Sequence, residues 1–310
     1  MIEFDHVGKN FGATKAVDNL SLHIARGEFM VLIGASGSGK STVLKMINRL
    51  VEHDSGNLRI DDQPVRSFQP ETLRRRMGYA IQSVGLFPHW TVERNVAAVP
   101  ALLHWAPERI TQRVTELLTL LGLEPAHYRH RYPHQLSGGQ QQRVGVARAL
   151  AAEPDVLLMD EPFGALDPLT RAALQREMGR IHRASGRTIV FVTHDIDEAL
   201  ALATRIALID RGRLVQVGPP AELLRAPVNG FVADFMGRTD AGLRLLALQT
   251  VAQRMRRGEA AVGEGIAASA TLREALSEFV VRGVDRLAVV DIDGARCGAI
   301  HLCDLVRGAR

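Results

Sequence analysis

The sequence lacks the features that mark membrane-spanning, secreted and fibrous proteins. No apolar run reaches the roughly 18 residues that a transmembrane helix needs, and the best candidate, residues 199–209, is short and contains Arg205. The N-terminal residues alternate as in a strand and carry acidic side chains early, so we expect no signal peptide. There is no collagen period and no long heptad run. We therefore expect a soluble, cytoplasmic protein. Any role at a membrane would require binding to a partner protein.

Cysteine and lysine are also scarce. Cys297 and Cys303 are too few for a disulfide framework or a cysteine metal site. Only four of the 38 basic residues are lysines, and the net charge of +4 is small for 310 residues, so we expect no nucleic-acid partner. The 46% of apolar and 23% of charged residues are ordinary for a folded globular protein and exclude a disordered chain. The length allows two domains.

Residues 34–41 read GASGSGKS and match the phosphate-loop pattern GxxxxGKS. They follow an apolar strand expected over residues 29–33 and open a helix expected over residues 41–50. In such a loop the backbone N–H groups and the helix N-terminus point at phosphate oxygens. Lys40 would neutralise the β- and γ-phosphates, and the Ser41 hydroxyl would ligate Mg²⁺. The motif therefore predicts a nucleoside triphosphate site.

A second apolar strand, expected over residues 156–159, ends in the acid pair Asp160 and Glu161. Such a pair would lie at the carboxyl edge of a parallel sheet, where ligands of open α/β sheets bind. Asp160 is suited to hold Mg²⁺ through water, and Glu161 to polarise the attacking water as a general base.

The string LSGGQ at residues 136–140 comes before an amphipathic helix that reaches Ala151. With this string the sequence resembles the ATP-binding cassette (ABC) family, whose signature it is. Gly138 and Gly139 at a helix start make a second phosphate-binding helix terminus. One ATP has a single γ-phosphate, which Lys40 already reaches. The second helix terminus is therefore best explained if it binds the γ-phosphate of an ATP held by another copy of the chain. The resemblance implies the same: a head-to-tail homodimer with two ATPs between the subunits.

The resemblance covers residues 1–236 and implies roles for further residues. It implies that Glu161, His194 and Gln82 are catalytic, and that Ser41, Gln82 and Asp160 hold Mg²⁺. Asp167 would couple the two sites of the dimer, and Phe11 would stack on adenine. The ATP-contacting residues that it implies are Phe11, Val17, Gly34, Ala35, Ser36, Gly37, Ser38, Gly39, Lys40, Ser41, Thr42, Gln82, Ser137, Gly138, Gly139, Gln140, Asp167 and His194.

Strands that alternate with helices predict an α/β fold with a mostly parallel sheet. The resemblance adds an antiparallel N-terminal β subdomain and a helical subdomain at about 88–150. We expect an ATPase domain over residues 1–236, an Arg-rich linker over 237–258 and a small α+β domain over 259–310. Its pattern of helix, strand, Asp-Gly turn, strand and helix resembles a single cystathionine-β-synthase (CBS) domain.

Residues 85–105, with the aromatics Phe87 and Trp90, resemble the ATPases of bacterial osmoprotectant importers. That resemblance implies an ATP-hydrolysing subunit for import of glycine betaine, choline, carnitine or proline. Its partners would be membrane permease subunits, contacted through Phe87 and Trp90, and a periplasmic or lipid-anchored binding protein. It would lie peripherally on the cytoplasmic face of the plasma membrane. Three alternatives stay open: another quaternary amine or amino acid as cargo, a regulatory ATPase without a permease, and a nucleic-acid ATPase.

Overall fold

The computed structural model describes residues 1–81 and 85–306. The chain divides into two compact units, Met1–Pro219 and Pro220–Arg310. This division falls earlier than residue 236, and the second unit includes α9 (Pro220–Arg225), which contacts α11 (Ala241–Ala247). Within the two described stretches, no helix is both long enough and apolar enough to span a bilayer.

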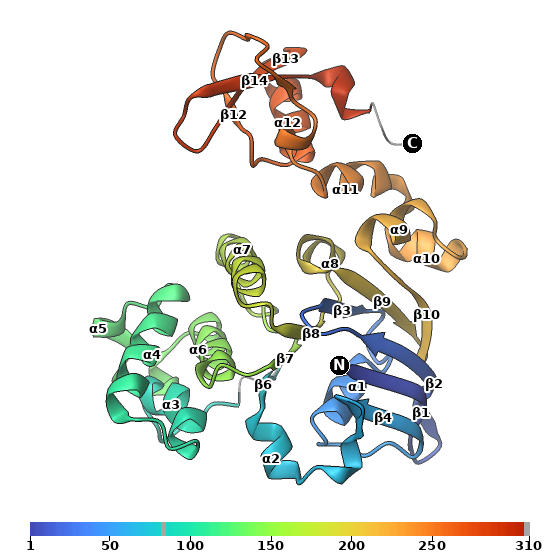
Figure 1. Ribbon diagram of the computed structural model, residues 1–310, viewed down its shortest axis with the longest axis vertical. Helices are drawn as coiled ribbons and strands as arrows, with labels where there is room; N and C mark the ends of the chain where they lie inside the picture. Colours follow the sequence, from blue (N-terminus) through green and yellow to red (C-terminus); the bar gives the residue numbers. More distant parts are fainter. Residues whose placement is uncertain (82–84, 307–310) are drawn as a thin grey trace. The chain divides into compact units, whose positions relative to one another are not determined.

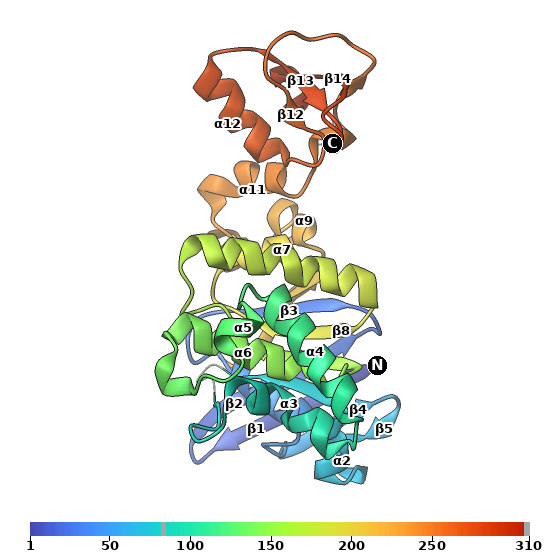
Figure 2. The same ribbon diagram turned by 90° about the vertical axis from the view of Figure 1, so that its left-hand side faces the viewer.

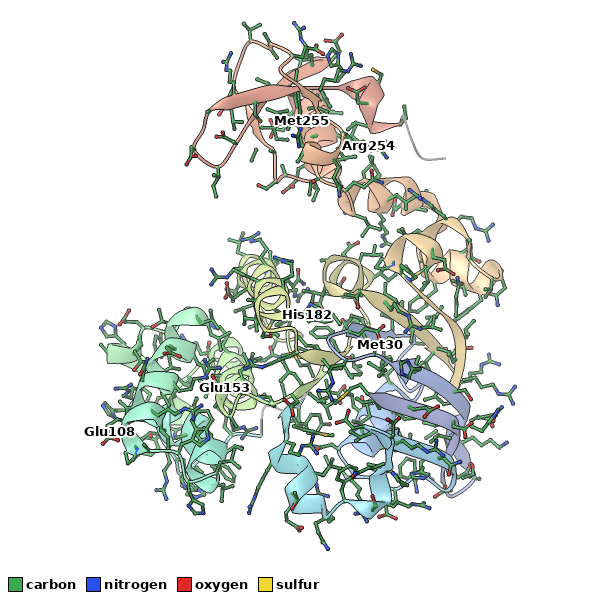
Figure 3. All side chains as sticks on the ribbon, viewed as in Figure 1. Met30, Glu108, Glu153, His182, Arg254 and Met255 are labelled. Carbon is green, nitrogen blue, oxygen red and sulfur yellow. The ribbon has the colours of Figure 1, made fainter. Side chains whose placement is uncertain are left out.

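A six-stranded sheet forms the centre of the first unit, with the strand order β10-β9-β3-β8-β7-β6 (Figure 1). All neighbours are parallel except β10 and β9. Three strands are buried along their whole length, as strands covered on both faces are; Met30 of β3 is labelled in Figure 3. The mostly parallel α/β sheet is thus confirmed. The strands are β3 (Phe29–Ile33), β6 (Met77–Ala80), β7 (Val156–Asp160), β8 (Thr188–Val192), β9 (Arg205–Asp210) and β10 (Arg213–Gly218).

A smaller antiparallel sheet has the order β2-β1-β4-β5 and confirms the expected N-terminal β subdomain. Its apolar side chains, including Ile2, Phe4 and Leu20, share one core with Leu32 of β3 and Val43 of α1 (Lys40–Ile47). Leu32 precedes the phosphate loop and Val43 follows it, so burial of this core holds both ends of the loop. The strands are β1 (Ile2–Phe11), β2 (Thr14–Ile24), β4 (Ser55–Ile60) and β5 (Gln63–Pro64).

The helices of the first unit fall into two sets. Four of them, drawn in green in Figure 1, gather into the expected helical subdomain: α3 (Val92–Leu102), α4 (Pro107–Leu120), α5 (Pro125–Tyr128) and α6 (Gly138–Ala151). The others are α1 (Lys40–Ile47), α2 (Pro70–Arg75), α7 (Pro168–Ser185) and α8 (Ile196–Leu202), with short 3-10 turns at Val65–Ser67 and Pro133–Gln135. α1 ends before residue 50, because Arg49 adopts a left-handed φ of 51°.

The second unit carries a four-stranded sheet with the order β11-β14-β13-β12. α12 lies beside this sheet in Figure 2, and its Leu272 and Phe279 pack with Val289 and Ile300. The elements are α9, α10 (Gly230–Phe235), α11, β11 (Arg256–Arg257), β12 (Ile266–Ala267), α12 (Leu272–Arg282), β13 (Arg286–Val290) and β14 (Arg296–His301), with 3-10 turns at Arg238–Asp240, Val251–Gln253 and Leu302–Leu305.

The segment predicted as an Arg-rich linker, residues 237–258, contains α11 and ends in β11, which pairs with β14. Met255, labelled in Figure 3, packs against the core of the second unit, and the neighbouring Arg254 donates to Gln249 Oε1 at 2.8 Å. Arg256 donates to Asp304 Oδ1 at 2.9 Å and holds the pKa of that carboxyl below its usual value. Asp304 lies within the 3-10 turn Leu302–Leu305, where the start of a last helix was expected.

Candidate active site

The order of the strands brings the expected site residues together. β8 lies between β3 and β7. The phosphate loop after β3, His194 after β8 and the acid pair at the end of β7 therefore meet at one edge of the sheet, the carboxyl edge. β6 pairs with β7 on its other side. Gln82, which was expected to contact Mg²⁺ and the attacking water, follows β6 but lies outside the described residues.

The phosphate loop is shaped by two glycines for which no other residue fits. Gly34 and Gly39 have φ values of 149° and 103°, and a Cβ atom there would meet the carbonyl oxygens of Ile209 at 2.0 Å and Ala16 at 2.2 Å. Lys40 opens α1, and its ammonium donates to the carbonyls of Gly34 (2.9 Å) and Ala35 (2.8 Å). Burial lowers the pKa of Lys40, and the carboxylates of Glu161 and Asp160 oppose that shift. A buried cation beside N–H groups at a helix start is suited to bind phosphate.

Ser41 and Asp160 lie in contact although 119 positions separate them. The Ser41 hydroxyl donates to Asp160 Oδ1 at 2.9 Å. Burial raises the pKa of Asp160, and the hydrogen bond from Ser41 opposes that shift. Hydroxyl and carboxylate oxygens are ligands that Mg²⁺ prefers, so this pair fits a Mg²⁺ ion beside the phosphate loop.

Glu161 has an unusual backbone. Its φ of 46° lies in the left-handed region, which costs a residue other than glycine about 1–3 kcal/mol and is concentrated at functional sites. Its N–H donates to the Val192 carbonyl at 3.0 Å, and its own carbonyl accepts from Gln142 Nε2 at 3.2 Å. The carboxylate Oε1 lies 3.2 Å from His194 Nδ1. The structure thus places Glu161, the expected general base, beside His194, the histidine that the resemblance implies positions it.

The turn that carries His194 is held by Thr193, Asp195 and Glu198, which were not among the expected site residues. Thr193 Oγ1 donates to Glu198 Oε2 at 2.7 Å and accepts from the Asp195 N–H at 3.0 Å. Glu198 is buried, and burial raises the pKa of its carboxyl. Asp195 caps α8. The spacing Asp-x-x-Glu at the start of a helix is the signal that could have identified this turn.

The signature residues lie at the start of α6. Ser137 caps the helix: its Oγ accepts from the Gln140 N–H at 3.3 Å, and Gln140 Oε1 accepts from the Ser137 N–H at 3.0 Å. Ser137 and Gly138 are exposed. A Cβ atom built at Gly138 would meet no atom within 4 Å, apart from its immediate neighbours. This chain therefore does not itself require glycine at position 138.

The remaining expected residues have different surroundings. Asp167 caps α7 and accepts from the Thr170 N–H at 3.0 Å, and Thr170 lowers the pKa of the Asp167 carboxyl. Phe11 is 52% exposed, so it is not a core residue, whereas Val17 is buried. The contact of Phe11 with adenine and that of Asp167 across a dimer stay predictions.

Comparison with known proteins agrees with this geometry. A family model described as ABC transporter matches residues 17–164. The chain is 62% identical to the glycine betaine uptake system ATP-binding protein YehX of Escherichia coli, over 99% of both chains. It is 49% identical to the glycine betaine/carnitine/choline transport ATP-binding protein OpuCA of Bacillus subtilis, over 94% of this chain and 76% of that one.

Solved structures include the dimeric cassette MJ0796, described as a bacterial ABC transporter cassette. It superposes with a TM-score of 0.67 at 34% identity, over 71% of this chain and 99% of that one. The same cassette is also solved as a dimer in a post-hydrolysis state bound to ADP and Pi.

A phosphate loop after a central parallel strand, facing an acid pair two strands away, defines a P-loop ATPase. This chain belongs to the ATP-binding subunits of ABC transporters. It binds ATP and is an ATPase of that family.

Proposed function

We propose that this chain is the ATPase subunit of a bacterial importer for osmoprotectants of the betaine type. The observation that carries the proposal is the 62% identity, over 99% of both chains, with an ATP-binding protein of glycine betaine uptake. The names of other relatives point to carnitine and choline as well. The common chemistry of these cargoes is a quaternary ammonium group. An importer ATPase would lie peripherally on the cytoplasmic face of the plasma membrane, bound to permease subunits that receive cargo from a binding protein.

In the proposed hydrolysis reaction, the loop residues and Lys40 hold the phosphates of ATP, and Glu161 accepts the proton of the attacking water. His194, 3.2 Å from the Glu161 carboxylate, orients it. Ser41, Asp160 and Gln82 would hold Mg²⁺, which supplies charge neutralisation at the phosphate oxygens.

We also propose that two copies bind two ATPs between them. The exposed Ser137 and Gly138, with open space where a Cβ of residue 138 would lie, leave room for the phosphate of a partner's ATP. The similar cassette MJ0796 is dimeric, which supports a dimer of this chain.

A groove of about 300 Å³ is the proposed contact for the permease. It is lined by Phe87 and Leu102, which are 42% and 56% exposed, together with Tyr79 and Arg148. Trp90 is half-buried beside Phe87, and the Arg94 guanidinium stacks on its ring. An apolar groove with aromatic walls suits an amphipathic helix of a partner.

A transport measurement tests the proposal. Reconstituted in vesicles with its permease and binding protein, the chain should drive ATP-dependent uptake of glycine betaine, choline, carnitine or proline. Uptake of a different amine or amino acid would show that the importer carries another cargo. Failure of the chain to co-purify with any membrane protein would favour a regulatory ATPase. Hydrolysis stimulated by DNA would favour the nucleic-acid alternative.

We further propose a single CBS-like domain at residues 259–310, outside the catalytic part. The phosphate loop, the acid pair, the signature and His194 all lie within Met1–Pro219. Truncation after Met236 should therefore leave basal ATP hydrolysis largely unchanged, because a domain outside the site can only bias an equilibrium between dimer states. Steady-state hydrolysis of the purified chains measures this, with a second truncation after Pro219 for comparison. Loss of hydrolysis in a truncated chain that keeps its unfolding transition would contradict the proposal.

A further inference from the structure

Gln142 connects two parts of the site that no motif links. It lies on α6, five positions after Ser137, and is 5% exposed. Its side-chain amide makes two hydrogen bonds: Nε2 donates to the Glu161 carbonyl at 3.2 Å, and Oε1 accepts from the Ala165 N–H at 3.0 Å. These partners are 19 and 23 positions away in the sequence. The signature helix is thus tied to the loop that runs from Glu161 to Asp167.

The two bonds require both ends of an amide. A carbonyl needs a donor and an N–H needs an acceptor, and an uncharged glutamine side chain supplies one of each. One of these bonds also stabilises a strained backbone conformation, because Glu161 has a left-handed φ of 46°. The N–H of Glu161 donates to the Val192 carbonyl, and the Glu161 carbonyl accepts from Gln142 Nε2 and from the Gly164 N–H. The direction of the Glu161 side chain follows from this backbone.

We propose that Gln142 is a positioning residue for ATP hydrolysis that also couples the two ATP sites. The coupling rests on the proposed dimer, in which Glu161 acts on the ATP bound by its own phosphate loop and Ser137 contacts the ATP bound by the partner. When α6 moves towards the partner's ATP, the two hydrogen bonds of Gln142 move the loop that carries Glu161 with it. The Glu161 carboxylate of each chain is then placed for catalysis only when the signature residues of the same chain contact the partner's ATP.

The first test is the variant Gln142→Leu, which keeps the size of the side chain and removes both bonds. Misplacement of a reacting group by 1 Å can cost roughly 100-fold in rate, so we expect kcat to fall at least about tenfold. The KM for ATP should stay nearly constant, because Gln142 does not line the phosphate loop. The Hill coefficient for ATP should fall from above 1 in the wild type to about 1. Gln112→Leu is the control, since Gln112 is exposed on α4 and, among the described residues, its side chain donates to Glu116 of the same helix at 2.9 Å.

The second test is the variant Gln142→Glu, which keeps the proposal testable if the leucine variant does not fold. A protonated carboxyl group can donate to Glu161 and accept from Ala165, whereas a carboxylate can only accept. Burial raises the pKa of such a carboxyl. The turnover of this variant relative to wild type should therefore rise as the pH is lowered from about 8 to about 6. A role in stability alone would lower the melting temperature and leave this ratio flat.

Wild-type kcat and Hill coefficient in folded Gln142→Leu would overturn the proposal. So would a loss of turnover that follows the melting temperature together with a flat pH ratio. If the wild type forms no ATP-dependent dimer, the proposed dimer and the coupling both fail. In that case a loss of kcat in Gln142→Leu at normal ATP affinity still assigns Gln142 to the positioning of Glu161.

Discussion

Replacement of Glu161 by Gln is expected to reduce ATP turnover by roughly 10²–10⁴-fold while ATP binding persists. The amide cannot accept the proton of the attacking water, but it has the size of the carboxylate and still lies beside His194, 3.2 Å away in the native site. The phosphate loop, with Lys40 bonded to its carbonyls, is not altered. Bound ATP that is not hydrolysed should hold the dimer closed.

Steady-state hydrolysis, equilibrium ATP binding and size-exclusion chromatography with ATP measure these three effects. Glu177→Gln is a matched control, because Glu177 lies on α7 and, within the described part of the chain, forms an ion pair with Arg180 of the same helix. Lys40→Ala should instead lose ATP binding and form no ATP-dependent dimer. Turnover near the wild-type level in Glu161→Gln would remove Glu161 from the role of general base.

A mixture of Lys40→Ala and Ser137→Arg chains should recover ATP binding at one site in each heterodimer. If each site combines the phosphate loop of one chain with the signature of the other, a heterodimer places both defects in one site and leaves the other intact. Each variant alone has a defect in both sites. The exposed Ser137, which bonds within its own helix turn, can accept an arginine without a clash in the isolated chain.

Binding stoichiometry of the purified heterodimer, isolated through two different tags, measures the recovery. A double variant that carries both substitutions in one chain, paired with a wild-type chain, is the matched control, since it should leave each site with one defect. Heterodimers that form but bind no ATP would show that each site lies within a single chain.

Local sequence was sufficient to predict most of the site. The phosphate loop, the acid pair and the signature each lie at a strand or helix end that hydrophobic periodicity marks. Residues held by distant partners could not be predicted in this way. Gln142 gives no local signal, because its two partners lie beyond α6, and Asp304 accepts a hydrogen bond from Arg256, 48 positions away.

The sequence by itself determined the class of this protein and the chemical types of its site residues, because glycines, a lysine and carboxylates at strand ends act through local backbone geometry. Only the tertiary structure decided which of these residues meet. β8 enters the sheet between β3 and β7, although it follows both in the chain, and so places His194 beside Glu161. The same packing holds Glu161 at a positive φ and buries Gln142 against it. Strand order and burial follow from contacts across the whole unit, which no short segment of the chain contains.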